Sequence, residues 1–223
     1  MRRVARAAAR VASPAAHRMF LPDPDKLAWC VIDGTAIFLD IRGDRYFRLP
    51  VEPNRRFLDA HDFPGPGVPV QPAGMPLPSS WQLPARQCPA IHEGPFRLGD
   101  VARALWMQRR VERQLSAGSF GAVLNDAHRV TSTRLCGAAV QDELPKREIR
   151  AFEQAKLLRS AADRCLPRSI ALGLCLARRQ FRAHIVLAVK LAPFAAHCWL
   201  QTGDEVLNDE VEEVLRYSPI LVV

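Results

Sequence analysis

Residues 165–179 (CLPRSIALGLCLARR) carry the strongest structural signal in the sequence. An apolar run follows Cys165 and ends at Arg178 and Arg179, whose cations suit the negative end of a helix dipole. Pro167 would fall in the first turn, where proline loses no helical hydrogen bond because the N–H groups there have no intrahelical partner. The stretch therefore predicts a helix that begins at Cys165.

A helix start at Cys165 has a chemical consequence. The positive end of the helix dipole would stabilise a thiolate there, and the cations of Arg164 and Arg168 would act in the same direction. The simpler interpretation is that Cys165 is a small buried hydrophobe, as free cysteines usually are. Two downstream residues, His197 and Asp209, favour the first interpretation.

These two residues fall in a region with strand patterns. Residues 183–191 and 195–201 read as successive strands, and residues 206–209 as a short third strand. A hydrogen bond between His197 on one strand and Asp209 on its neighbour is then plausible on geometric grounds. Alone, either residue would be an ordinary structural histidine or turn acid.

A thiol, an imidazole and a carboxylate in this order suit attack on an acyl carbon. The imidazole of His197 would take the proton of the Cys165 thiol, and Asp209 would fix the tautomer and orientation of the imidazole. Together the three residues predict a cysteine hydrolase or acyltransferase.

The same residues carry a family resemblance. Four features, CLPRSIAL, HIVLAVKLAPFAAHCWL, the acid at Asp209 and the terminal YSPILVV, resemble the leader peptidases of lasso-peptide biosynthesis, the microcin-J type B proteins, over residues 97–223. The resemblance implies an α+β fold with a transglutaminase-like (papain-like) cysteine-peptidase domain. It also implies Cys165 as nucleophile, His197 as general base and acid, and Asp209 as the residue that orients His197.

The resemblance implies a function as well. Members of that family cut the leader from a ribosomally made precursor peptide, which frees the N-terminal amine of the core. A partner cyclase related to asparagine synthetase then joins this amine to a side-chain carboxylate, using ATP. The expected partners are therefore the precursor peptide and the cyclase. No cofactor is expected on this chain, and any ATP dependence would act through the cyclase.

The N-terminal part of the chain predicts a small three-stranded sheet. Residues 29–32 and 36–40 flank Asp33-Gly34, a strong hairpin signal, and residues 45–49 supply a third strand. The pattern DGTAIFLDIRGDRYFRL is similar to the precursor-recognition modules of peptide-modifying enzymes, which add a leader segment as a strand to an exposed sheet edge. The resemblance implies leader binding by Arg45, Tyr46, Phe47, Arg48 and Leu49. The alternative is an ordinary sheet without a ligand.

The pattern divides the chain into a basic, disordered extension (1–22), a β-rich leader-recognition module (23–62), a proline-rich connector (63–95) and the catalytic domain (96–223). Nine of the 18 prolines fall in residues 63–95, which excludes helix and interior strand there. Only residues 52–61 offer a helix beside the small sheet. Apolar residues at helical spacing predict two further helices, at 98–117 and 144–162.

The net charge of +8 is concentrated at the N-terminus. Residues 1–18 hold five arginines and no acid, and without them the charge falls to +3, so nucleic-acid binding is not expected. We expect Met19 to be the functional start. No apolar run approaches the roughly 18 residues that would indicate a membrane span.

The six cysteines form no C-x-x-C pair, and H-E-x-x-H is absent, so the sequence predicts no metal site. Without a secretory signal pattern, the prediction is a cytoplasmic protein with reduced thiols. Cys198 neighbours His197 but should point to the opposite strand face, and we do not expect it to compete with Cys165.

Two other functions fit the sequence. A transglutaminase-like amidase or deamidase could use the same triad on another substrate, and a non-catalytic relative could present the precursor to the cyclase as a chaperone. Product mass separates them, because leader hydrolysis splits the precursor whereas deamidation leaves it whole.

Overall fold

The computed structural model describes residues 26–223 except 64, 90–93, 119, 136–144 and 160–163. The predictions for the basic extension and for Met19 lie outside the described residues. The helices are α2 (Val51–Ala60), α3 (Leu98–Ala117), α4 (Phe120–Leu135), α5 (Lys146–Leu158), α6 (Cys165–Arg178) and α7 (Val211–Val214). The strands are β1 (Leu27–Ile32), β2 (Thr35–Asp40), β3 (Arg45–Arg48), β4 (Arg86–Gln87), β5 (His184–Leu191), β6 (Phe194–Thr202), β7 (Glu205–Val206) and β8 (Ser218–Val222).

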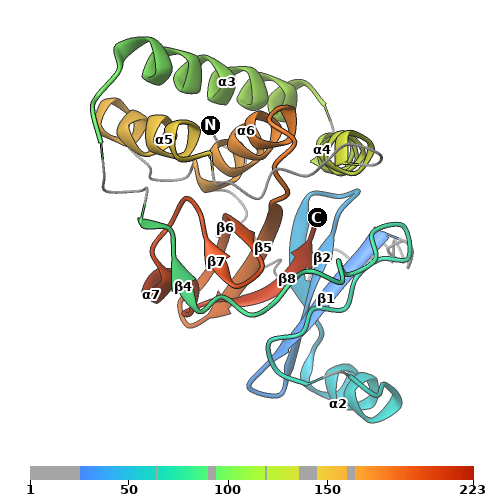
Figure 1. Ribbon diagram of the computed structural model, residues 1–223. Helices are drawn as coiled ribbons and strands as arrows, with labels where there is room; N and C mark the ends of the chain where they lie inside the picture. The colour runs from blue at the N-terminus through green and yellow to red at the C-terminus, as the bar shows by residue number, and fades with distance from the viewer. Residues whose placement is uncertain (1–25, 64, 90–93, 119, 136–144, 160–163) are drawn as a thin grey trace.

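A five-stranded sheet with the order β4-β7-β6-β5-β8 carries a layer of helices on one face (Figure 1). Helix α6 packs on β6 and β5, and α3, α4 and α5 pack around α6. Every residue from Leu166 to Gly173 is buried, because the helix lies between the sheet and the outer helices. The sheet and this helix layer thus form the main hydrophobic core, which fixes where the N-terminus of α6 lies.

The opposite face of the five-stranded sheet is covered in part by the proline-rich segment. Val186, Trp199 and Val222 form a smaller core on this face, and Trp81 packs against it. Ser80 Oγ and His184 Nε2 share a 2.9 Å hydrogen bond, and Gln201 Nε2 donates to the Gln82 carbonyl oxygen at 2.6 Å. The described part of residues 63–95 contains no helix and only the edge strand β4, as the prolines predict.

The small sheet has the order β1-β2-β3, and its predicted hairpin is confirmed. Ile32 pairs with Thr35, so the turn is the two residues Asp33 and Gly34, both at positive φ (47° and 71°). Such a conformation matches the twist of a two-residue hairpin and favours glycine at the second position. Asn54 of α2 accepts from the Ala36 N–H and donates to the Gly34 carbonyl oxygen, both at 2.9 Å, which anchors the helix to this turn.

The two faces of the small sheet have different coverings. On one face, Phe38 stacks on Phe47 with ring centroids 5.1 Å apart and meets the edge of Phe57 from α2 at the same distance. On the other face, Ile37 and Leu39 join the main hydrophobic core, and β1 packs beside β8 (Figure 1). The small sheet is therefore built into the same core as the helix layer, while the module boundaries drawn from the sequence stay predictions.

The α+β fold class is confirmed, with a separate three-stranded antiparallel sheet at the N-terminal side. The helix predicted at 98–117 is α3 to the residue, and the helix at 144–162 is α5, which starts at Lys146 and ends at Leu158. Helix α4 was not predicted. The strand predicted at 206–209 is wrong in extent, since β7 ends at Val206 and Asp209 lies in the following bend. None of the helices in the described ranges combines the length and the apolar character that a membrane crossing requires.

Candidate active site

The predicted helix start is confirmed, because Cys165 is the first residue of α6 and Arg164 precedes it as N-cap. Helix geometry leaves the first N–H groups without an intrahelical partner, so they can stabilise negative charge at this end. The Cys165 side chain is half-buried and packs against the main core. A thiol at this position therefore lies beside free backbone N–H groups and is still partly exposed.

The two neighbouring arginines each lie close to a carboxylate. Arg168 Nη2 lies 3.3 Å from Asp209 Oδ2, and Arg164 Nε lies 3.9 Å from Glu112 Oε1. Both guanidinium groups thus face carboxylates. Their expected effect on a Cys165 thiolate stays a prediction, and the structure adds a direct contact between Arg168 and the predicted catalytic acid.

His197 lies on β6 and connects the thiol to the carboxylate. Its Nε2 is 2.9 Å from Asp209 Oδ2, and its side chain also shares a hydrogen bond with Cys165. Because Nε2 is occupied by Asp209, the thiol lies on the Nδ1 side of the ring. Burial alone would lower the pKa of His197, but the hydrogen bonds to Asp209 and Cys165 raise this pKa to about 9. The imidazole is therefore cationic at neutral pH.

Two aromatic rings flank the imidazole of His197. The Tyr217 ring lies 4.9 Å from it at an interplanar angle of 31°, and the Trp199 ring lies 6.1 Å from it at 34°. Lys190 Nζ sits 4.7 Å from the centroid of the Tyr217 ring. These rings restrict the imidazole to one orientation and give an imidazolium a favourable π-surface.

Asp209 receives three donors. Its Oδ2 accepts from His197 and Arg168, and its Oδ1 accepts from the Glu210 N–H at 3.0 Å. Burial opposes ionisation of this carboxyl, but the hydrogen bond and charge of His197 and the charge of Arg168 hold its pKa below the usual value. Asp209 is thus an ionised acceptor for His197, and the chain of contacts predicted from the sequence is present.

A buried polar cluster, which the sequence did not reveal, holds the flanks of the site. Asn208 Nδ2 donates to Ser169 Oγ at 2.9 Å, and Asn208 Oδ1 accepts from the Leu200 N–H at 2.7 Å. Ser169 Oγ donates to the carbonyl oxygen of Cys198 at 3.1 Å. Ser169 and Asn208 are 0% and 2% exposed, and each lies next in sequence to a member of the Arg168–Asp209 ion pair. The one sign of this cluster in the sequence was Ser169, a polar residue at the start of the apolar run of the helix.

Cys198 points to the α6 side of the sheet, whereas its neighbour His197 contacts Trp199, whose side chain belongs to the opposite core. Burial raises the pKa of the Cys198 thiol well above its ordinary value, and the nearby charge of Cys165 adds to this shift. Cys198 therefore stays protonated, which explains in chemical terms why it would not compete as a nucleophile.

The residues predicted to bind the leader lie on β3 and just after it. Arg45 Nε donates to Asp40 Oδ2 at 3.0 Å, Phe47 stacks on Phe38, Arg48 is exposed, and Leu49 follows the strand. Among the described strands, β3 pairs with β2 alone, so its other edge is open. Their part in leader binding stays a prediction.

Tyr46, also predicted to bind the leader, faces the main core instead of solvent. Its ring lies 5.9 Å from that of Phe194, at the start of β6. Burial raises the pKa of the phenol, and the charges of Cys198 and Cys165 contribute to the rise. Tyr46 thus brings the small sheet close to the thiols of the site.

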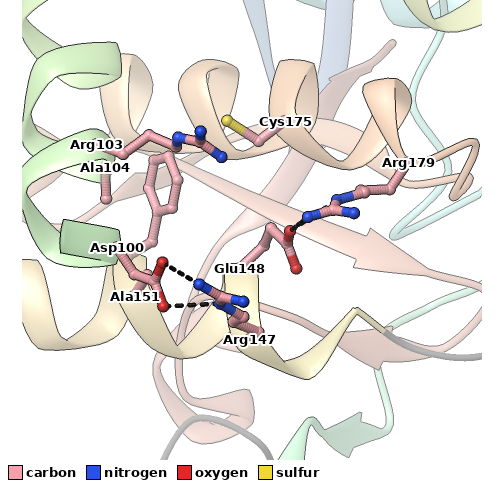
Figure 2. A pocket seen from close by; sticks show the side chains of 9 residues that line it. Asp100, Arg103, Ala104, Arg147, Glu148, Ala151, Cys175 and Arg179 are labelled. Carbon is pink, nitrogen blue, oxygen red and sulfur yellow. Dashed lines mark hydrogen bonds and ion pairs between the residues drawn. The ribbon is translucent and has the colours of Figure 1, made fainter. Parts of the chain in front are cut away.

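A pocket of about 170 Å³ lies elsewhere, between α3, α5 and α6 (Figure 2). Two ion pairs line it, Asp100 with Arg147 and Glu148 with Arg179, each at 2.8 Å, and Cys175 lies at its rim beside Arg103. Burial raises the pKa of Cys175. Neither Cys165 nor the other triad residues line this pocket. In the described ranges, no three His, Cys, Asp or Glu side chains gather in a group that could hold a metal ion.

Cys165 at a helix start, His197 on the adjoining sheet and Asp209 in the bend after β7 form the arrangement expected of a transglutaminase-like domain, and sequence comparison places the chain in that class. Residues 98–222, more than half of the chain, match the transglutaminase-like superfamily, so the chain belongs to that superfamily. Over 45 residues it is 42% identical to the microcin J25-processing protein McjB of Escherichia coli, a match that covers 20% of this chain and 22% of that protein. The match thus spans about a fifth of the length of that relative. No solved structure matches the chain significantly.

Proposed function

We propose that this protein is a cysteine endopeptidase that removes the leader from a ribosomally made lasso-peptide precursor. The observation that carries the proposal is the continuous set of contacts from Cys165 through His197 to Asp209 at the start of α6. The similarity to a microcin-processing protein supports the choice of substrate. The product would be a core peptide with a free N-terminal amine.

The first half of the reaction forms a thioester. The Cys165 thiolate attacks the scissile carbonyl carbon, and the N–H groups at the start of α6 are well placed to stabilise the oxyanion that develops. The His197 imidazolium then donates its proton to the departing amine as the C–N bond breaks. A histidine pKa of about 9 keeps this proton available at neutral pH.

The second half of the reaction releases the leader. Neutral His197 accepts a proton from water, the resulting hydroxide attacks the thioester carbonyl, and the C–S bond breaks to give the Cys165 thiolate and a leader carboxylic acid, which loses its proton to solvent. Asp209 keeps the Nε2 side of the ring occupied, so Nδ1 remains directed at the thiol throughout.

In this proposal the substrate docks on the small sheet. The leader would add as a strand along the open edge of β3, which raises the effective concentration of the scissile bond at Cys165. In this proposal residues 23–62 act as the leader-recognition module and residues 96–223 as the catalytic domain. The released core would pass to an ATP-dependent cyclase in the cytoplasm.

The test is a mass measurement with purified protein and a lasso precursor peptide from the same source. We expect the wild type to release the leader, Cys165→Ala to release none, and Cys175→Ala to behave as wild type, since Cys175 is half-buried on the same helix but far from the triad. An intact precursor about one mass unit heavier would indicate a deamidase instead. No cleavage by the wild type, with or without an added cyclase, would contradict the peptidase proposal.

A further inference from the structure

Arg168 occupies an unusual position for a cation. It lies one helical turn after Cys165 on α6, and its side chain is only 6% exposed. Its Nη2 donates to Asp209 Oδ2 at 3.3 Å. Its Nε and Nη1 are buried and have no hydrogen-bond partner among the described residues.

Packing does not account for this side chain. Burial of a guanidinium with unpartnered N–H groups costs free energy, and an apolar side chain of similar volume usually serves a core equally well or better. The favourable interaction that the structure does provide is with the Asp209 carboxylate. The contact with Asp209 is therefore the feature of the structure that can explain a cation at this position.

The contact also has a geometric effect. Arg168 and Cys165 project from neighbouring turns of one helix, so a bond from Arg168 to Asp209 ties the acid to the element that carries the thiol. A second bond joins Ser169, the residue after Arg168, to Asn208, the residue before Asp209. Two successive helix residues thus hold two successive residues of the bend.

We propose that Arg168 is a positioning residue that keeps Asp209 ionised and directed at His197. The inference rests on the proposed roles of Cys165, His197 and Asp209 as a catalytic triad. Arg168 touches neither substrate nor thiol in this proposal and acts through Asp209.

The other charged and titratable groups around this pair have separate partners or positions. Lys156 on α5 donates to the Asn208 carbonyl oxygen at 3.4 Å and pairs with Glu153, and Lys190 on β5 lies over the ring of Tyr217. The remaining groups are Cys165 on α6, Cys198 on β6, Tyr46 on β3 and Glu210 after the bend. Besides His197, Arg168 is the cation in hydrogen-bond contact with Asp209. Its removal should therefore change the titration of this carboxyl directly.

The test compares Arg168→Met, Arg168→Lys and a control, Arg179→Met, which removes a guanidinium–carboxylate pair from the other end of α6. We expect Arg168→Met to lower kcat/KM for precursor cleavage about tenfold to a hundredfold. The acid limb of its pH profile should move up by about one pH unit. Its Tm should fall at neutral pH, because the variant leaves the buried Asp209 carboxylate with one cation fewer. Arg168→Lys should restore part of the activity and the wild-type acid limb, and Arg179→Met should match the wild type.

A second readout separates this inference from the proposed function. The side-chain carboxyl of Asp209, followed by ¹³C NMR in labelled protein, should titrate at higher pH in Arg168→Met than in the wild type and Arg179→Met. This shift would support the inference even if no precursor were cleaved. An unshifted carboxyl titration, or a fall in Tm with a wild-type pH profile, would show that Arg168 is only a structural residue and overturn the inference.

Discussion

The amide of Asn208 donates a 2.9 Å hydrogen bond to the hydroxyl of Ser169, which joins the residue before Asp209 to the helix that begins at Cys165. The same hydroxyl donates to the carbonyl oxygen of Cys198, the residue after His197. One buried side chain thus connects the backbone flanks of all three triad residues. Preorganisation of this kind matters because small displacements of catalytic groups lower rates steeply.

Asn208→Ala should therefore weaken both the fold and the site. The substitution leaves the buried Leu200 N–H without its acceptor, and we expect a loss of about 2 kcal/mol or more in the free energy of unfolding. Precursor cleavage should fall at least about tenfold at a temperature where the variant is folded. Urea unfolding and mass-based cleavage rates measure the two effects.

Asn54→Ala is the matched control for this prediction. It also removes two side-chain hydrogen bonds, but at the hairpin of the small sheet. Its stability loss should be smaller because that site is more exposed, and the alkylation rate of Cys165 should stay at the wild-type value. Full activity in Asn208→Ala would show that the Ser169–Asn208 contact does not position Asp209.

Selective alkylation is a direct test of the environment of Cys165. Cys165 and Cys175 are both half-buried on α6, but Cys165 lies at the helix start and bonds to His197, whereas burial raises the pKa of Cys175. Iodoacetamide at neutral pH should therefore modify Cys165 at least about tenfold faster. Peptide mapping by mass spectrometry would give both rates in one sample, and equal rates would contradict the thiolate-stabilising role of the helix start.

Local signals in the sequence predicted the elements that carry the triad. The helix start at Cys165 follows from Pro167 and the closing arginines, and the turn at Asp33 and Gly34 follows from backbone preferences of those two residues. Such signals depend on neighbours within a few positions. They were sufficient to propose that Cys165, His197 and Asp209 lie together. They did not predict that Asp209 lies in a bend instead of a strand.

Contacts between distant segments were not predictable in this way. Ser169 and Asn208 are 39 positions apart, and their hydrogen bond depends on how α6 packs against β6. Arg168 was expected to act on the thiol, and its 3.3 Å contact with Asp209, 41 positions away, was not predicted. Helix α4 was missed because its sequence mixes apolar residues with asparagine, aspartate, serine and threonine, which favour helices only weakly.

The protonation of His197 should appear in the pH dependence of stability. Its pKa rises from 6.5 to about 9 on folding, so the stabilisation is complete below pH 6.5 and is lost as the pH rises through 9. In this window the free energy of unfolding should fall by at most about 1.4 kcal/mol per pH unit. Urea unfolding at several pH values should show this slope in the wild type and not in His197→Gln.

His184→Gln is the control for the pH experiment. Burial, followed by the charge of Arg182, lowers the pKa of His184 to about 4, so its neutral form stabilises the fold above pH 6.5 and this contribution is lost as the pH falls through 4. His184→Gln should therefore change the acid side of the stability curve and leave the slope above neutral pH intact. A wild-type slope that survives in His197→Gln would contradict the assignment of the raised pKa to His197.

Strand addition at β3 makes a prediction about hydrogen exchange. The open edge of β3 presents backbone N–H groups that no described strand covers, and such groups exchange quickly unless another strand pairs with them. With Cys165→Ala as an uncleaving binder, a lasso precursor should slow exchange in peptides covering residues 45–49 by about tenfold or more. A scrambled leader should not slow exchange there.

The edge strands β4 and β8 of the larger sheet serve as internal controls, since the proposal places no ligand there. Protection confined to β8, or cleavage by the wild type without protection of β3 in Cys165→Ala, would show that the leader docks elsewhere and that Arg45 to Leu49 have another role.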